Sequence, residues 1–163
     1  MTKEKLSRAV YKSPVGELLI VCTETALLSL GVRKEQESAE DKENNPVIQQ
    51  TIKELEEYFA GNRKVFTVPL DLRGTEFQKK VWEALREIPY GETRSYKEIA
   101  EKIGNPKASR AVGMANHWNP IGIVVPCHRV VGANGKLTGY AGGLPMKKAL
   151  LELENKGKDK AES

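Results

Sequence analysis

One stretch of nine residues, 123–131, limits the possible folds of this chain more than any other segment. Its sequence is Ile-Val-Val-Pro-Cys-His-Arg-Val-Val, and the β-branched residues at both ends predict a buried or half-buried strand. Pro126 has no backbone N–H to give to a sheet, so we expect regular strand pairing to stop near it. The fold therefore has to bury this stretch while it holds Cys127 and His128 out of the sheet.

The adjacent Cys127 and His128 are the candidate reactive pair. Thiolate is the nucleophilic form of cysteine, and a neighbouring histidine can lower the thiol pKa below its usual value of about 8.5. Successive side chains of an extended chain point to opposite faces, so this pair needs either a backbone kink or a bridging water. If His128 is a base, another group must hold its second ring nitrogen. The alternative is that Cys127 is a small buried apolar residue and His128 a surface residue.

Composition sets the broad class of the protein. The 163 residues are 39% hydrophobic and 29% charged, which is typical of one ordinary globular domain or two small ones. The net charge of +4 is compatible with a nucleic-acid partner. Two cysteines without a signal peptide predict free thiols and a cytoplasmic protein. With only two cysteines and two histidines, we expect no structural zinc and no other metal.

The first 72 residues predict a small α+β domain, in which an antiparallel sheet carries one covering helix. The turn signal Ser13-Pro14-Val15-Gly16 separates the first two strands. Apolar residues recur at helical spacing over 48–59, and Gly61 marks the end of that helix. The charged segment Arg33–Asn45 predicts a long loop or a disordered link. The predicted strands are residues 7–11, 17–22, 28–32 and 65–70.

The pattern becomes helical from Gly74 onward. Two capping boxes, Thr75 to Gln78 and Ser95 to Glu98, predict the starts of two amphipathic helices. A third helix is predicted over Lys107–Asn116, with Asn105-Pro106 at its N-terminus. The predicted domains are an N-terminal scaffold, 1–72, and a C-terminal domain, 73–155, followed by a polar tail, 156–163.

The second and third of these helices are joined at Gly104, which is typical of a helix-turn-helix. The third helix carries the small residues Ala108, Ala111 and Gly113 together with one cation, Arg110. Such a helix can pack tightly against protein, or it can enter a DNA groove with one cationic side chain projecting. The pattern alone leaves both possibilities open.

The last part of the chain predicts a hairpin and a final helix. Gly132-Ala133-Asn134-Gly135 predicts a hairpin turn, and Lys136–Tyr140 the return strand. The final helix places Met146 and Leu150 on one face, and Glu154 lies one turn beyond Leu150. An acid at that position can hold a histidine, or it can be a charge at the boundary of the buried face.

The motif Pro126-Cys127-His128-Arg129-Val130, with Asn119-Pro120 before it and Gly139–Gly143 after it, closely resembles the O6-alkylguanine-DNA alkyltransferases. The resemblance is strong from about Gly74 to Glu154 and weak before it. It implies a ribonuclease-H-like N-terminal domain and a winged-helix-like C-terminal domain. It also implies a monomer that binds alkylated double-stranded DNA from the minor groove, flips the base out and transfers the alkyl group irreversibly to Cys127. No cofactor is implied, and acceptance of O4-alkylthymine is left open.

The resemblance assigns roles by position. Cys127 is the alkyl acceptor, His128 polarises it through a bridging water, and Glu154 orients His128. Asn119 ties the active stretch to the helix-turn-helix, and Tyr96 helps to protonate the departing guanine. The implied DNA-binding residues are Arg110, which fills the space of the extruded base, with Tyr96, Ser95, Ala108, Ala111 and Gly113. The implied base-pocket residues are Val130, Tyr140, Ala141 and Gly142.

Ala141 stands where some relatives have serine, and we expect little loss there because the family uses a backbone donor at that loop. Asn116 and Gly122 also stand where some relatives differ, which bears on the size preference of the pocket and not on the reaction. Two other functions compete with alkyl transfer. A damaged-base recognition module would use the helix-turn-helix and leave Cys127 inert. A cysteine hydrolase would use Cys127 with its histidine and glutamate, but it would leave the helix-turn-helix without a role.

Overall fold

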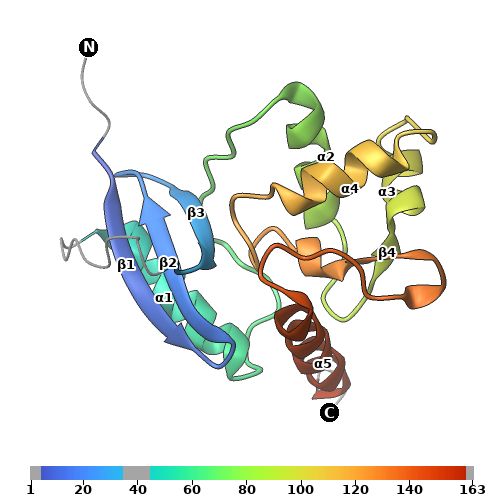
Figure 1. The fold of residues 1–163 in the computed structure, drawn as a ribbon. Helices are drawn as coiled ribbons and strands as arrows, with labels where there is room; N and C mark the ends of the chain where they lie inside the picture. Colours follow the sequence, from blue (N-terminus) through green and yellow to red (C-terminus); the bar gives the residue numbers. More distant parts are fainter. Residues whose placement is uncertain (1–4, 35–44, 161–163) are drawn as a thin grey trace. The chain divides into compact units, whose positions relative to one another are not determined.

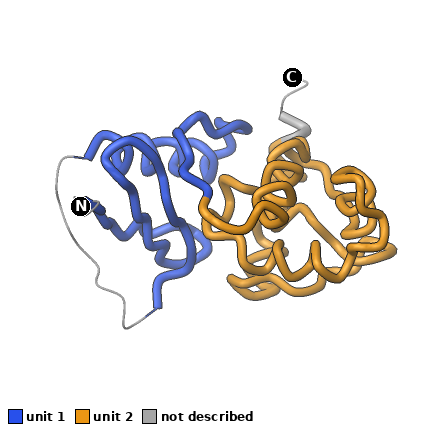
Figure 2. The backbone as a smooth tube through the Cα atoms, turned by 90° about the horizontal axis from the view of Figure 1, so that it is seen from above, with its two compact units in different colours: residues 1–72 blue, residues 73–163 orange. Residues whose placement is uncertain are grey.

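The computed structural model describes residues 5–34 and 45–160, and the chain forms two compact units, 1–72 and 73–163 (Figure 2). The loop predicted over Arg33–Asn45 falls mainly on residues 35–44, which lie outside the described ranges. Within those ranges, no helix has the length and apolar character needed to cross a membrane.

The N-terminal unit is built on a three-stranded antiparallel sheet (Figure 1). The strands β1 (Ser7–Ser13), β2 (Gly16–Cys22) and β3 (Leu27–Val32) pair in sequence order. Side chains alternate along β2 so that Leu18 and Ile20 are fully buried, as the period of two requires. The three predicted strands are therefore confirmed.

Helix α1 (Pro46–Phe59) packs against this sheet and supplies the other half of its core. Asn45 caps the helix, because its side-chain oxygen accepts hydrogen bonds from the backbone N–H groups of Val47 (2.7 Å) and Ile48 (3.2 Å). Leu55 and Tyr58 are fully buried on the face that contacts the strands. The predicted covering helix is confirmed.

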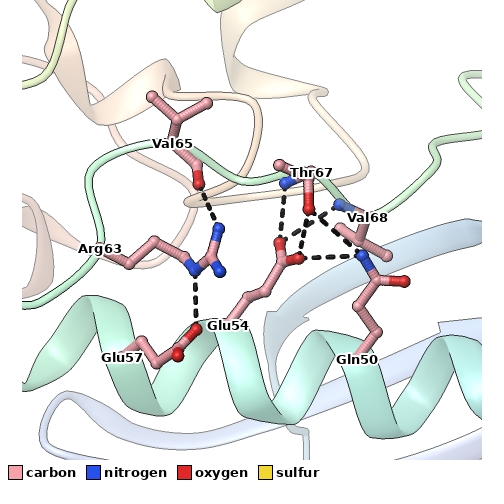
Figure 3. Close-up of polar contacts among 7 residues, drawn as sticks. All are labelled: Gln50, Glu54, Glu57, Arg63, Val65, Thr67 and Val68. Carbon is pink, nitrogen blue, oxygen red and sulfur yellow. Dashed lines mark hydrogen bonds and ion pairs between the residues drawn. The ribbon is translucent and has the colours of Figure 1, made fainter.

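The strand predicted over 65–70 is wrong, and the reason lies in Glu54 of α1 (Figure 3). Its carboxylate accepts hydrogen bonds from the backbone N–H groups of Thr67 (2.8 Å) and Val68 (3.2 Å), and from the Thr67 hydroxyl (2.7 Å). These donors are therefore not available to a sheet, and Pro69 has none to offer. Leu70 forms a single bridge to β3, so a side chain of α1 rather than a ladder holds this segment.

The C-terminal unit is mostly helical. Its elements are α2 (Glu76–Arg86), β4 (Arg94–Ser95), α3 (Tyr96–Lys102), α4 (Ser109–His117), a 3₁₀ turn over Cys127–Arg129, β5 (Val130–Val131), a second 3₁₀ turn over Ala133–Gly135, and α5 (Leu144–Lys160). Both predicted capping boxes are formed, at Thr75 and at Ser95. Trp82 of α2 is buried and its indole N–H donates to the Ala115 carbonyl oxygen of α4 at 2.8 Å. Helix α4 lies between α2 and α3 (Figure 1).

Two predicted boundaries and one predicted strand in this unit differ from the structure. Helix α4 begins at Ser109 rather than Lys107, because the N–H of Ala108 donates to the Asn105 carbonyl oxygen at 3.0 Å and closes a separate turn. The return strand over 136–140 does not form, because side chains rather than a strand bind the Thr138 carbonyl oxygen. Helix α5 continues to Lys160, through most of the segment predicted as a polar tail.

Candidate active site

The stretch 123–131 contains a strand only at its end, where β5 pairs in parallel with β4. Ile123 has a positive φ of 68°, and the N–H of Val125 donates to the Ile121 carbonyl oxygen at 3.0 Å, so the first part is a tight turn. The strand predicted before Pro126 is therefore wrong. The backbone kinks after Pro126 into the 3₁₀ turn that begins at Cys127.

Asn119 fixes the turn that precedes the cysteine. Its side-chain N–H groups donate to the carbonyl oxygens of Val125 (2.8 Å) and Ile121 (3.3 Å), and its side-chain oxygen accepts from the Ile121 N–H at 3.0 Å. Because Asn119 follows directly on the end of α4, it connects that helix to the backbone beside Cys127. Its geometry agrees with a residue that holds the reactive stretch in place.

A buried ionic network lies beside Cys127. Nε2 of His128 is 2.7 Å from one carboxylate oxygen of Glu154, and both side chains are at most 1% exposed. Arg129 binds the same carboxylate with two nitrogens, at 2.8 and 3.0 Å, and donates to the Ile88 carbonyl oxygen at 2.7 Å. A carboxylate with this many donors is fully satisfied although it is buried. The third group expected to hold His128 is thus Glu154.

The charges of the network follow from this geometry. Burial raises the pKa of Glu154, but the hydrogen bonds from His128 and Arg129 and the charge of Arg129 outweigh it and bring the pKa to about 2. Burial lowers the pKa of His128 and prevails over the attraction of Glu154, so the ring is neutral at neutral pH. An ionised carboxylate only accepts hydrogen bonds, so the histidine proton resides on Nε2. Nδ1 is then an acceptor, and it has no hydrogen-bond partner among the described residues.

Cys127 is 5% exposed, and burial raises its pKa, against a hydrogen bond from Asn119 and the charge of Lys147. Its resting form is therefore the thiol, whereas the sequence suggested that the adjacent histidine could lower the pKa. Lys147 of α5 is fully buried and its ammonium group donates to the carbonyl oxygens of Val130 and Thr138. It joins the backbone at the start of β5 to the segment before Tyr140, and it adds a positive charge near the sulfur.

Sequence reasoning missed both Arg129 and Lys147. For Arg129 a signal was present, because an arginine within an apolar run needs a carboxylate partner once it is buried. For Lys147 the signal was its spacing, because Leu150 and Glu154 follow it at i+3 and i+7 on one helix face.

The predicted base-pocket residues lie around the same centre. Burial raises the pKa of Tyr140, and the charges of Cys127 and Glu154 raise it further. Val130 is fully buried. A Cβ atom at Gly142 would come within 2.6 Å of the Met146 sulfur and 2.9 Å of the Tyr140 ring, so a side chain at that position would require these neighbours to shift. Ala141 is exposed beside them.

Tyr96 reaches this loop from the start of α3. Its hydroxyl lies 3.4 Å from the Thr138 carbonyl oxygen and 3.3 Å from the Thr138 hydroxyl. Ser95, the cap of α3, is engaged with Glu98, since its hydroxyl accepts from the Glu98 N–H at 3.1 Å. Tyr96 is thus joined to the pocket loop, whereas Ser95 serves the helix end.

The remaining predicted DNA-binding residues lie on α4 or directly before it. A groove of about 600 Å³ runs between the start of α2 and α4. Arg110 is exposed at this groove, and Ala108 and Ala111 form part of its wall. Gly113 faces Tyr96 instead, because a Cβ atom there would lie 3.8 Å from the tyrosine ring. The groove is lined by Thr75, Phe77, Gln78, Lys107, Ala108, Arg110, Ala111, Met114 and Ala115.

Comparison with known proteins gives matches over nearly the whole chain. Residues 76–156 match the family model described as the DNA binding domain of 6-O-methylguanine DNA methyltransferase, and residues 6–72 match its ribonuclease-like domain. A methylated-DNA–protein-cysteine methyltransferase of Methanosarcina acetivorans is 55% identical over 150 residues, which are 90% of this chain and 96% of the relative.

The chain belongs to the methylated-DNA–protein-cysteine methyltransferase family.

Solved structures agree with this assignment. The O6-methylguanine methyltransferase of Mycobacterium tuberculosis superposes with a TM-score of 0.86 at 47% identity, covering 93% of this chain and 94% of that one. The OGT of the same organism in complex with DNA gives 0.84 at 49% identity, covering 92% and 93%. The predicted family is confirmed, and so is the fold class, an α+β chain with a ribonuclease-like domain and a helical DNA-binding domain.

Proposed function

We propose that this methyltransferase repairs double-stranded DNA by moving the alkyl group from O6 of guanine to the sulfur of Cys127, once per molecule. The observation that carries the proposal is a buried thiol followed directly by a neutral histidine, which an ionised glutamate holds through Nε2. A nucleophile, a base and a group that orients the base are the parts that nucleophilic catalysis requires.

The reaction begins with the proton of the Cys127 thiol. Nδ1 of His128 accepts it through a water, because adjacent residues on this turn suit a bridged contact. The positive charge that develops on the ring is offset by Glu154 at 2.7 Å. Lys147 stabilises the thiolate by its charge. The buried thiol is thus activated only when its proton has an acceptor.

The thiolate then attacks the alkyl carbon. A sulfur–carbon bond forms, the bond between that carbon and O6 breaks, and the electron pair remains on the guanine. The Tyr96 hydroxyl donates to the ring as this charge develops, in the manner of other preorganised donors. The thioether formed on Cys127 has no hydrolytic exit, so each molecule reacts once. Acceptor and leaving group are already present, so the chemistry requires no cofactor.

Access to O6 requires the base to leave the duplex. Flipping costs a few kcal/mol, and a side chain inserted into the stack reduces this cost. Arg110 supplies that side chain, while Ala108 and Ala111 allow the start of α4 to approach the minor groove closely and Gly113 leaves space for the Tyr96 ring. The flipped guanine then occupies the pocket formed by Val130, Tyr140, Ala141 and Gly142. Ser95 contributes to DNA binding from its position at the start of α3. The protein acts as a monomer in the cytoplasm.

The test is the mass of the intact protein after incubation with duplex DNA that contains one O6-methylguanine. We expect a gain of one methyl group, located on Cys127 by peptide mapping and absent in Cys127→Ala. Cys22→Ala is the matched control, because Cys22 is also buried and burial raises its pKa to about 12. It should react as the native protein does. Tight binding to the lesion without a mass gain would contradict transfer and indicate a recognition module.

A further inference from the structure

Two large apolar side chains, one on α4 and one at its C-cap, are exposed, and neither contributes to the core. Met114 and Trp118 are each 61% exposed. The N–H of Trp118 donates to the Met114 carbonyl oxygen at 3.1 Å, so the two residues lie one helical turn apart on the same face. Arg110 lies one turn before Met114. We call Arg110, Met114 and Trp118 the outer stripe of α4.

The outer stripe is not required by the packing of the unit. Helix α4 is held through its other face, where Val112, Ala115 and Asn116 are buried and Trp82 binds the Ala115 carbonyl oxygen. His117 lies edge-on to the Trp118 ring at a centroid distance of 5.3 Å, which supports the indole in its exposed position. Neighbouring large apolar side chains in water are typical of a surface that binds a partner.

We propose that Met114 and Trp118 extend the DNA-contacting face of α4 beyond Arg110 and give apolar contacts to the duplex beside the flipped base. The inference rests on the proposed function, which places Arg110 in the DNA. Charge also favours DNA, because α4 carries Arg110 and no acidic residue, and Lys107 borders the same groove. A DNA complex is known for a relative that covers 92% of this chain.

The dimensions of the stripe indicate which base pairs it reaches. Eight residues separate Arg110 from Trp118, which is about 12 Å along a helix that rises about 1.5 Å per residue. Base pairs repeat about every 3.4 Å. If the helix runs along the groove, Trp118 lies about three or four base pairs to one side of the lesion. The minor groove, about 6 Å wide, is narrower than a helix, and apolar side chains commonly widen it by pressing on sugars and base steps.

Salt dependence separates this apolar contact from a cationic one. The affinity for unmodified duplex is measured between about 50 and 200 mM salt for the native protein, Trp118→Ala, Met114→Ala and Lys107→Ala. We expect Trp118→Ala to weaken binding about tenfold at every salt concentration, with the slope of log K against log salt unchanged, since burial of an apolar side chain releases no counterions. Lys107→Ala should instead reduce the slope by about 0.9.

Fluorescence provides a second readout on the folded protein. The chain has two tryptophans, and Trp82 is 2% exposed, so a change in emission on adding duplex reports Trp118. We expect this change in the native protein and its loss in Trp118→Phe, which keeps a ring and most of the affinity. Val65→Ala, which removes a side chain that is 69% exposed in the other unit, is the control and should bind as the native protein does.

The outcomes distinguish this inference from the proposed function. If methyl transfer to Cys127 fails, the proposed function is wrong. If transfer succeeds but Trp118→Ala and Met114→Ala bind duplex as tightly as the native protein, with no change in emission on adding DNA, the outer stripe does not contact DNA. A dimer that Trp118→Ala abolishes, together with unchanged DNA affinity, would likewise overturn the inference and identify a self-association surface.

Discussion

Glu154→Gln is the substitution whose consequences the structure defines most fully. It removes the charge from a carboxylate that binds two nitrogens of Arg129 and Nε2 of His128. The guanidinium would remain buried without its counter-ion, and breaking a buried pair in this way typically costs about 3–5 kcal/mol. The drop in the Glu154 pKa from its ordinary 4.5 to about 2 corresponds to about 3 kcal/mol, which agrees with that range.

The sign of the pH dependence follows from the same drop. The folded state binds the Glu154 proton more weakly than the unfolded state, so the stabilisation is present above pH 4.5 and is lost as the pH falls towards 2. The native protein should therefore lose about 3 kcal/mol from this group across that window. Glu154→Gln should start about 3 kcal/mol lower at neutral pH and lack this part of the slope.

Urea unfolding followed by tryptophan fluorescence measures this effect. Both tryptophans, Trp82 and Trp118, belong to the C-terminal unit, so the signal reports the unit that contains Glu154. Glu152→Gln is the matched control on the same helix, because Glu152 is 61% exposed and its ion pair with Lys148 is 4.0 Å long. An unfolding free energy of Glu154→Gln within about 0.5 kcal/mol of the native value at neutral pH would contradict a stabilising role of the Glu154 charge, since surface substitutions have effects of that size.

Three further predictions follow from other parts of the chain. Arg110→Ala should slow repair of duplex DNA much more than reaction with the free modified base, and equal losses in the two rate assays would contradict its assigned role. Lys147→Met should slow alkylation of Cys127, because the charge near the sulfur and the ties to Val130 and Thr138 are both lost, and methyl-transfer rates at fixed pH measure this. Glu54→Gln should destabilise the N-terminal unit by about 1–3 kcal/mol above pH 4.5. Burial raises the pKa of the Glu54 carboxyl, but its hydrogen bonds outweigh burial and lower that pKa, so the charged form is the stabilising one. A native-like thermal midpoint of this variant would contradict the prediction.

The parts of the fold that the sequence predicts correctly depend on residues close together in the chain. The capping boxes at Thr75 and Ser95 are each completed within one helical turn, and the alternation over 17–22 is decided within one strand. The segments predicted wrongly are those whose backbone groups bind distant side chains. Glu54 takes the N–H groups of Thr67 and Val68, thirteen and fourteen residues away.

In the candidate site, too, the sequence predicts the local features and misses the contacts between distant residues. The motif around Cys127 and the spacing of Glu154 in the last helix point to the reactive pair and its acid. The twofold contact of Arg129 with Glu154 spans 25 residues, and neither local spacing nor composition encodes it. The direction of the Cys127 pKa depends on how deeply the thiol is buried, which only the packed structure reveals. The roles of Tyr96 and Arg110 stay predictions, because they are exerted on DNA.

The most direct test of the mechanism is the protonation state of His128, observed by nitrogen NMR of the imidazole ring across the pH range of activity. We expect a neutral ring at neutral pH, with the proton on Nε2 towards Glu154 and a free lone pair on Nδ1. In Glu154→Gln this single tautomer should no longer be enforced. An imidazolium at neutral pH, or a neutral ring with its proton on Nδ1, would contradict the assignment of His128 as the acceptor of the Cys127 proton.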